Sequence, residues 1–175
     1  MTVMFTRRAI GSTAVAVLAT ALAMGVMPGT ADAAPRTFQF KGFGTGQCMV
    51  ANTSTRTVQA NKCTAFTSQG WQMLPMNTVS PEGFQEFELR NVPFAECARA
   101  GDTAPHGALL LGTCDPNDHM TVFDQLVPNF MEPQQFRLKG FNVCIDRPSE
   151  FPNDGSNLQV YTCNHQHTEQ LISLH

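Results

Sequence analysis

The stretch that decides the fold runs from Phe141 to Ile172 and reads FNVCIDRPSEFPNDGSNLQVYTCNHQHTEQLI. It contains two short segments in which apolar and polar residues alternate, and each segment carries a cysteine, Cys144 or Cys163. Alternation with a period of two predicts β-strands with one buried face. A polar loop lies between the two segments, and a disulfide between the two cysteines would tie the strands at their ends.

The cysteines mark three copies of this unit. They form short-range pairs that are 15, 17 and 19 residues apart, and successive pairs begin 49 and 47 residues apart: Cys48 and Cys63, Cys97 and Cys114, Cys144 and Cys163. A fixed period near 48 residues indicates an internal repeat. We place the repeats at about residues 36–85, 86–134 and 135–175.

Each copy predicts about four short strands. An apolar-polar-apolar segment opens each copy, another strand precedes each second cysteine, and an apolar stretch follows it. The opening segments are residues 38–43, 87–92 and 136–141. No segment of the mature chain shows a helical apolar stripe with caps. We therefore expect an all-β, closed, three-fold structure, because closure removes exposed strand edges.

The first 33 residues predict a signal peptide. The pair Arg7-Arg8 precedes an apolar run from Ala9 to Val26, and Ala31-Asp32-Ala33 matches a cleavage site. We expect a secreted protein whose mature part, residues 34–175, forms one domain. A transmembrane anchor is the competing interpretation of the apolar run. The twin-arginine and general secretory routes both remain open.

In an exported protein, an even number of cysteines indicates a disulfide framework. Their spacing favours one disulfide within each repeat, and each would stabilise the fold by roughly 3 kcal/mol. A metal site is the rival interpretation. No cysteine pair has the ligand spacing of a zinc site, and His165 and His167 lie in a loop without fixed geometry, so we expect no metal and no cofactor.

The composition argues against nucleic-acid binding and catalysis. The net charge is −3, and no run of Lys or Arg offers a basic patch. No serine stands in a nucleophile-elbow motif. Glycoside hydrolysis needs two facing carboxylates, and Asp102, Asp146 and Glu169 fall in different loops that nothing in the sequence joins. We expect a protein that is not an enzyme.

The repeat resembles the ricin B-type lectin family, whose fold is a β-trefoil. In that family a Cys is followed two residues later by Asp, a Gln and an aromatic residue precede the second Cys, and a Gln-x-Trp follows. The clearest matches, within a resemblance that spans residues 38–175, are Cys144-Ile145-Asp146, Gln159-Val160-Tyr161-Thr162-Cys163 and Gln69-Gly70-Trp71. The resemblance implies a β-trefoil that binds carbohydrate.

The family's binding positions carry over best to the third repeat. Asp146 would accept hydrogen bonds from sugar hydroxyls, and Tyr161 would stack on the apolar face of the sugar. Gln159 and Gln170 stand at the two glutamine positions. Glu169 stands where the family often has Asn, which leaves open whether it accepts a hydroxyl or is only a solvated charge. Asn164 and His165 are further neighbours.

The other two repeats lack the acid and the ring, although the first keeps its glutamines, Gln59 and Gln69. In the first, Val50 replaces the acid and Asn61 the ring. In the second, Arg99, Leu110 and Gly112 replace the acid, the glutamine and the ring. We expect little sugar binding at either place.

The sequence therefore predicts a secreted, non-catalytic lectin with one galactose-type site, whose partners are galactosides or cell-surface glycans. An alternative is a subunit of a multi-chain toxin of the cytolethal distending type, which would hold a separate protein chain. A third interpretation, a trefoil protease inhibitor, would use the loop from Pro148 to Gly155 as its reactive segment.

Overall fold

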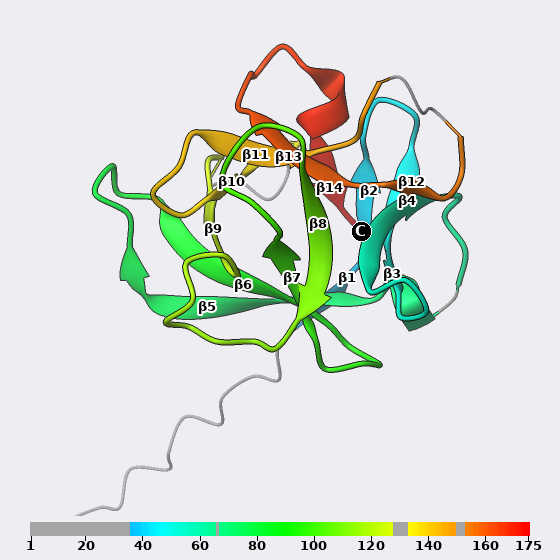
Figure 1. Cartoon of the computed structure of the whole chain (residues 1–175), viewed down its shortest axis with the longest axis horizontal. Helices are drawn as coiled ribbons and strands as arrows, with labels where there is room; N and C mark the ends of the chain where they lie inside the picture. Colours follow the sequence, from blue (N-terminus) through cyan, green and yellow to red (C-terminus); the bar gives the residue numbers. More distant parts are fainter. Residues whose placement is uncertain (1–35, 66, 128–132, 150–152) are drawn as a thin grey trace, which may run out of the picture. The chain divides into compact units, whose positions relative to one another are not determined.

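Figure 1 shows the chain as a computed structural model that describes residues 36–65, 67–127, 133–149 and 153–175. All of these residues belong to one unit, Ala34–His175. The predicted signal peptide, residues 1–33, lies outside the described residues. Within the described ranges, no helix is long and apolar enough to cross a membrane.

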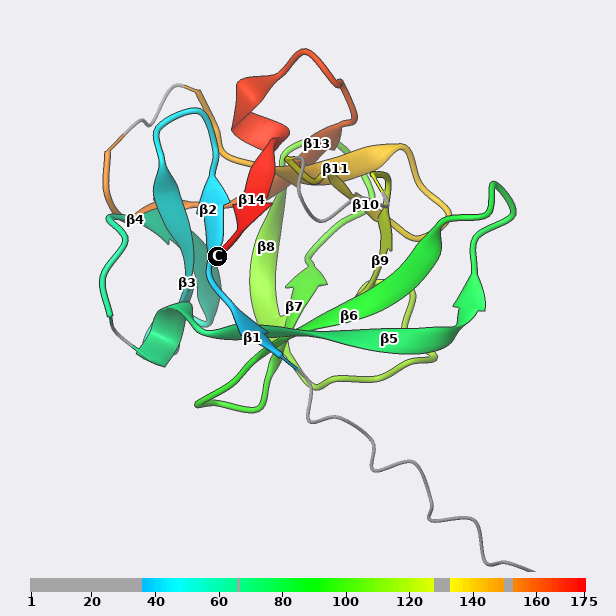
Figure 2. The same ribbon diagram turned by 180° about the vertical axis from the view of Figure 1, so that it is seen from behind.

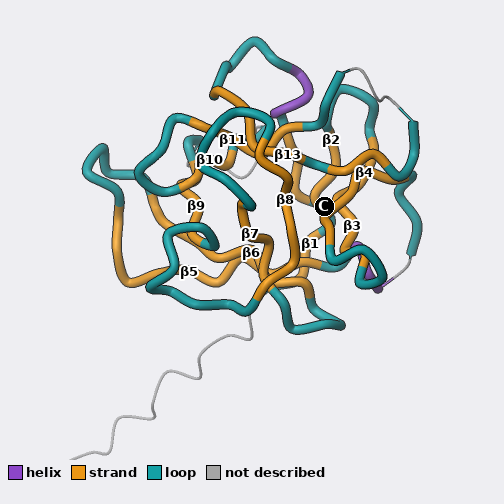
Figure 3. Tube along the Cα trace, viewed as in Figure 1, coloured by secondary structure: helices purple, strands orange, loops and turns teal. Residues whose placement is uncertain are grey.

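Short strands make up most of the regular structure, and two single-turn 3-10 helices complete it within the described ranges (Figure 3). The strands and helices are β1 (Thr37–Phe38), β2 (Phe40–Gly42), β3 (Gln47–Asn52), β4 (Thr57–Asn61), η1 (Thr67–Gln69), β5 (Trp71–Val79), β6 (Gln85–Asn91), β7 (Cys97–Ala100), β8 (Gly107–Gly112), β9 (Val122–Gln125), β10 (Phe136–Leu138), β11 (Val143–Asp146), β12 (Ser156–Asn157), β13 (Gln159–Thr162), η2 (Thr168–Gln170) and β14 (Ile172–Leu174).

The first and last strands of the three repeats close into a barrel. β1 pairs with β5, β5 with β6, β6 with β9, and β9 with β10, all antiparallel. β14 pairs with β2 (Figure 2), and a bridge between Gln134 and Ile172 brings β14 beside the start of β10. Because only Gln39 separates β1 from β2, the ring of pairings returns to its start.

The middle strands of each repeat form hairpins that meet one another. These hairpins are β3–β4, β7–β8 and β11–β13. β8 pairs with both β4 and β13, and β12 pairs with β4. Six barrel strands with three hairpins in a three-fold pattern are a β-trefoil, so the predicted all-β fold class is confirmed.

A Phe-rich core fills the barrel. The rings of Phe40 and Phe136 meet edge to face with centroids 5.4 Å apart. Trp71 is fully buried and donates its indole N–H to the Met49 carbonyl at 2.9 Å, which satisfies the one polar atom of its side chain. The core therefore draws on all three repeats.

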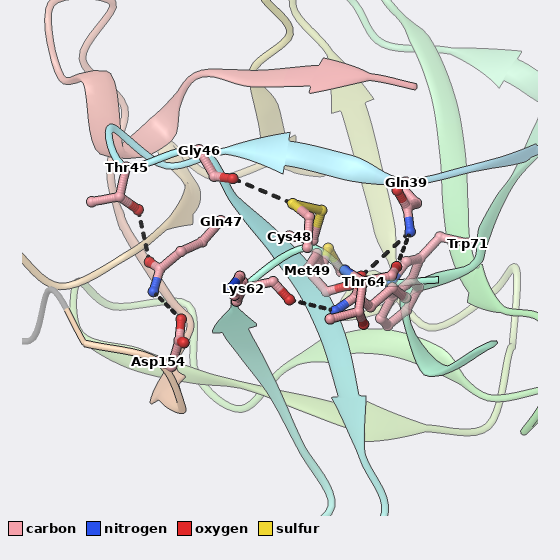
Figure 4. Close-up of a disulfide and its surroundings, with 12 residues drawn as sticks. Gln39, Thr45, Gly46, Gln47, Cys48, Met49, Lys62, Thr64, Trp71 and Asp154 are labelled. Carbon is pink, nitrogen blue, oxygen red and sulfur yellow. Dashed lines mark hydrogen bonds between the residues drawn. A yellow bond between two sulfur atoms is a disulfide. The ribbon is translucent and has the colours of Figure 1, made fainter. Parts of the chain in front are cut away.

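The three predicted disulfides are all present. Cys48 bonds to Cys63, Cys97 to Cys114, and Cys144 to Cys163. In each repeat the first cysteine lies in one strand of the hairpin and the second follows the other strand. Figure 4 shows the bond of the first repeat beside the buried Trp71. The cross-link fixes the open end of each hairpin.

Candidate functional site

A cavity of about 400 Å³ opens in the third repeat. Four of the five predicted site residues lie in its wall: Asp146, Gln159, Tyr161 and Glu169. The other described residues that line it are His106, Arg147, Pro148, Ser149 and His167. The structure thus brings the end of β11, the length of β13 and the helix η2 together around one space.

The register of β11 and β13 explains why these side chains meet. Asp146 lies directly opposite Gln159, and Cys144 lies opposite Tyr161. Side chains two residues apart on a strand share a face, so Gln159 and Tyr161 point the same way. Gln159 donates from Nε2 to Asp146 Oδ2 at 2.7 Å. The pair forms a fixed acceptor group beside the Tyr161 ring.

The Asp146 carboxylate is only 4% exposed. Burial raises its pKa above the ordinary value, and the nearby Glu169 charge acts in the same direction. The hydrogen bond from Gln159, the nearby Gln170 amide and the charge of His167 favour the ionised form and oppose that rise in pKa. A buried carboxylate that keeps its amide donors is a strong acceptor for ligand hydroxyls.

Gln170, the fifth predicted residue, lies behind the cavity. Its side chain is fully buried. Its Oε1 accepts from the Asn164 backbone N–H at 2.9 Å and from Gln135 Nε2 at 2.8 Å, and its Nε2 donates to the Thr162 carbonyl at 2.9 Å. Its amide therefore fastens the loop that follows Cys163 to the end of β13.

Gln69 makes the same bonds in the first repeat. Its Oε1 accepts from the Thr64 backbone N–H at 2.8 Å and from Gln39 Nε2 at 3.3 Å, and its Nε2 donates to the Lys62 carbonyl at 2.9 Å. Gln39, Thr64 and Lys62 are labelled in Figure 4. In the first and third repeats, the glutamine at this position therefore holds the loop that follows the second cysteine.

Glu169 lies at the rim of the cavity, and its side chain is 27% exposed. The Arg147 guanidinium, which is buried and donates from Nε to the Phe43 carbonyl at 2.8 Å, lies 4.0 Å from Glu169 Oε1. Nothing in the sequence joins Asp146 to Glu169, but both line this cavity because η2 packs against β11. Asp102 does not line this cavity.

Two histidines flank the Tyr161 ring, His106 and His167, and neither was predicted to belong to the sugar site. His106 packs edge-on against Tyr161 with centroids 4.8 Å apart, and its Nδ1 lies 3.3 Å from Gln159 Oε1. His167 lies parallel to Tyr161, with an interplanar angle of 10° and centroids 6.5 Å apart. The aromatic surface of the site is therefore larger than one ring.

His106 comes from the second repeat. It ends the turn between β7 and β8, has a φ of 71°, and donates its backbone N–H to Val160 of β13. The equivalent turn of the third repeat makes the same contact, since Gly155, with a φ of 88°, donates to Ala60 of β4. An alignment of the repeats could show that His106 and Gly155 end equivalent turns. Only the pairing of neighbouring hairpins shows that this turn position contacts the next repeat.

At the positions equivalent to Asp146 and Gln159, the other two repeats have different side chains. Val50 lies opposite Gln59, and Arg99 lies opposite Leu110. The Arg99 side chain pairs with Asp118 at 3.1 Å and passes so close to Gly112 that a Cβ there would lie 2.9 Å from its Cδ. Arginine thus fills the space that the aromatic ring occupies in the third repeat.

The metal-site and protease-inhibitor interpretations concern two other parts of the chain. Glu88, Cys97 and Cys114 form a group of metal-ligand types, but the two sulfurs are bonded to each other, so neither is a thiolate ligand. The loop Pro148–Gly155, considered for protease inhibition, includes residues 150–152, which lie outside the described residues.

Solved structures with very low sequence identity share this fold. A ricin B-like lectin from Macrolepiota procera, solved in complex with lactose, matches with a TM-score of 0.64 over 81% of this chain and 96% of its own, at 11% identity. The Rhizoctonia solani agglutinin gives 0.62 over 80% and 94%, at 13% identity. A designed three-fold symmetric protein, ThreeFoil, gives 0.68 over 79% and 96%, at 9% identity.

Proteins of other kinds match as well. The Haemophilus ducreyi cytolethal distending toxin gives a TM-score of 0.61 over 79% of this chain and 81% of its own, at 13% identity. An exo-β-1,3-galactanase from Clostridium thermocellum gives 0.68 over 82% of this chain and 30% of its own, at 11% identity. No protein-family model matches the chain, and no curated protein matches its sequence. The described part of the chain therefore has the fold of ricin B-like lectins.

Proposed function

We propose that this β-trefoil protein is a secreted, non-catalytic lectin with one competent sugar site, in the third repeat. The observation that carries the proposal is the buried Asp146 carboxylate, held by Gln159 at 2.7 Å in the same cavity wall as the Tyr161 ring. An acid with fixed amide partners beside an aromatic face matches the two kinds of surface on a sugar, hydroxyls and C–H groups.

Each residue has a distinct task in the proposed site. Asp146 accepts hydrogen bonds from two neighbouring hydroxyls, because a carboxylate has about four acceptor sites and Gln159 uses one. The Tyr161 ring lies against the apolar face of the sugar, and Gln159 holds the Asp146 carboxylate beside it. Gln170 is a positioning residue, since it holds the loop that carries Glu169.

The choice of a galactose-type sugar rests on resemblance. The Macrolepiota procera lectin of the same fold was solved in complex with lactose, and the acid position of the family repeat is intact in this chain at Asp146. A single shallow site typically binds a monosaccharide near the millimolar range, roughly 4 kcal/mol. Strong attachment to a glycan-bearing surface would then need several copies of the protein.

A glycan array with the oxidised mature protein tests the proposal. Asp146→Asn keeps the shape of the side chain and removes the charge, and we expect the signal on galactosides to fall at least tenfold. Asp115→Asn is the matched control, because Asp115 is an exposed acid of the second repeat, away from the cavity. A folded, disulfide-bonded protein with no signal on any glycan would overturn the lectin assignment.

A second candidate function is the holding of a separate protein chain, as in a cytolethal distending toxin. The exposed apolar side chains of Val92 and Phe94, 39% and 40% exposed in the turn between β6 and β7, favour it because they lie outside the third repeat. In that case the protein should copurify with the product of an adjacent gene, and Phe94→Ser should weaken this association. Retention of the complex by the variant would contradict it.

A further inference from the structure

A second cavity, of about 480 Å³, adjoins the first. His106, Pro148 and Gln159 line both cavities, so the two share a wall. Along the chain, Asn157 lines the second cavity, Gln159 lines both, and Tyr161 lines the first. Residues at this spacing share one face of an extended chain, so the two cavities follow one line along β12 and β13.

This line is longer than a single sugar. Tyr161 follows Asn157 by four steps along the extended chain, which corresponds to about 13 Å at about 3.3 Å per residue. One pyranose ring covers less than half of that length. A ligand that fills both cavities must therefore contain at least two linked rings.

The second cavity has the chemistry to bind hydroxyl groups. Its described lining includes four polar side chains, together with the small Ala108 and the backbone around Gly155: Asn153, Asp154, Ser156 and Asn157. Ala108 lies opposite Gln159 in the β8–β13 pair, and a Cβ added at Gly155 would have nothing within 4 Å. Small residues therefore form the bottom of the second cavity, and the polar side chains lie at its rim.

Two of these polar groups are held by the first repeat. Gln47, which is 7% exposed, donates from Nε2 to Asp154 Oδ1 at 2.9 Å. Gln59 donates from Nε2 to Asn157 Oδ1 at 3.0 Å, and Asn52 fixes Gln59 in turn at 3.1 Å. A bond to one atom of an amide or carboxylate orients the other atom toward a ligand. Gln59, the glutamine of the lost first site, thereby supports the second cavity.

We propose that the two cavities form one groove that binds a neutral oligosaccharide. The inference rests on the proposed function: the terminal galactose-type ring occupies the first cavity against Tyr161, and the following ring lies over Gln159 and Ala108. Asp154 and Asn157 hydrogen-bond the hydroxyls of this second ring. The oligosaccharide is neutral because the carboxylates of Asp146, Glu169 and Asp154 outnumber the one guanidinium of the described lining, Arg147, which already faces Glu169, so the groove repels an acidic sugar.

Calorimetric titration of the oxidised mature protein with galactose and with a linear β-linked galactotriose tests the groove. We expect the trisaccharide to bind about tenfold more tightly than the monosaccharide. Asn157→Ala should reduce trisaccharide affinity about tenfold and leave galactose affinity unchanged, since β12 pairs with β4 through its backbone. Asn117→Ala, an exposed asparagine of the second repeat, is the matched control. Circular dichroism confirms that each variant is folded.

The outcomes separate this inference from the lectin assignment. Equal affinity for galactose and the trisaccharide, with binding still lost in Asp146→Asn, would overturn the groove and leave the third-repeat site intact. Failure of the folded protein to bind either sugar would overturn both. A trisaccharide that carries a carboxylate on its second ring should bind at least tenfold more weakly, and equal binding would contradict the neutral preference.

Discussion

The second and third repeats have the same frame and different contents. Arg99 and Leu110 face each other in the second repeat as Asp146 and Gln159 do in the third, and a disulfide closes each hairpin. Yet Arg99 fills its own site and pairs with Asp118, whereas the third repeat keeps an open cavity. The frame sets where a site can form, and a few side chains decide whether it does.

The first repeat adds a third outcome. Val50 replaces the acid, and Gln59 turns to Asn157 of the third repeat. Because neighbouring hairpins pair with each other, side chains of the first repeat hold side chains that line a cavity of the third. Comparison of equivalent positions across the repeats therefore separates residues that hold the fold from residues that we propose bind sugar.

The largest expected effect concerns a core position that the first and third repeats share. Trp71 and Ile172 occupy the same position in the first and third repeats, and both are fully buried. Trp71→Ala should lower the free energy of unfolding by about 3–5 kcal/mol, because it also leaves the Met49 carbonyl without its donor. Urea unfolding followed by circular dichroism measures it. An equal or larger loss in Ile172→Ala would show that the third repeat dominates the core.

A smaller effect compares the two structural glutamines. Gln69→Ala and Gln170→Ala each remove the partners of buried backbone groups, and each should cost about 1–3 kcal/mol. Only Gln170→Ala should also weaken galactose binding, because only its loop carries part of the cavity. Thermal unfolding and titration with galactose measure the two effects. If Gln69→Ala weakened galactose binding as much as Gln170→Ala does, the two glutamines would not differ in their effect on the third-repeat cavity, contrary to the prediction.

The smallest effect concerns the pH dependence of the third-repeat site. Since burial raises the pKa of Asp146, protonation should weaken sugar binding as the pH falls, with a midpoint above the ordinary value of 3.8. Calorimetric titrations of galactose between pH 7 and pH 4 measure this midpoint. A binding curve that stays flat down to pH 4 would contradict it.

The same raised pKa has a consequence for stability. A group with a raised folded pKa contributes stability that is present at low pH and is lost as the pH rises through that pKa. Asp146→Asn removes the charge, so the variant should be more stable than the parent at pH 7 and should lose this advantage in acid. Thermal unfolding of the parent and of Asp146→Asn, at pH 7 and in acid, measures this difference in stability.

The sequence sufficed for the fold because its signals are local and repeated. The spacing of Cys144 and Cys163, copied twice upstream, predicts the repeats and the disulfides that the structure contains. Asp146, Gln159 and Tyr161 could be assigned to one site because the resemblance to ricin B-type repeats implies it, and the pairing of β11 with β13 brings them close together. Such positions depend only on contacts within one hairpin.

Contacts between repeats escaped prediction. His106 reaches Tyr161 only because β8 pairs with β13, and no pattern within one repeat states which hairpins are neighbours. Glu169 joins Asp146 for a related reason, since η2 folds back over the end of β11. The role of Gln170 was also hidden, because a motif position alone does not tell whether an amide faces the ligand or the backbone.

The reciprocal backbone bonds between Gln39 and His175, at 2.8 and 3.0 Å, have a topological consequence. They place the first strand and the last residue of the trefoil side by side, so a short linker would join them without strain. The chain could then be opened at a turn between repeats, and a circular permutant could begin with any of the three. A permutant that begins at the third repeat would join its last strand to the first repeat by a continuous chain.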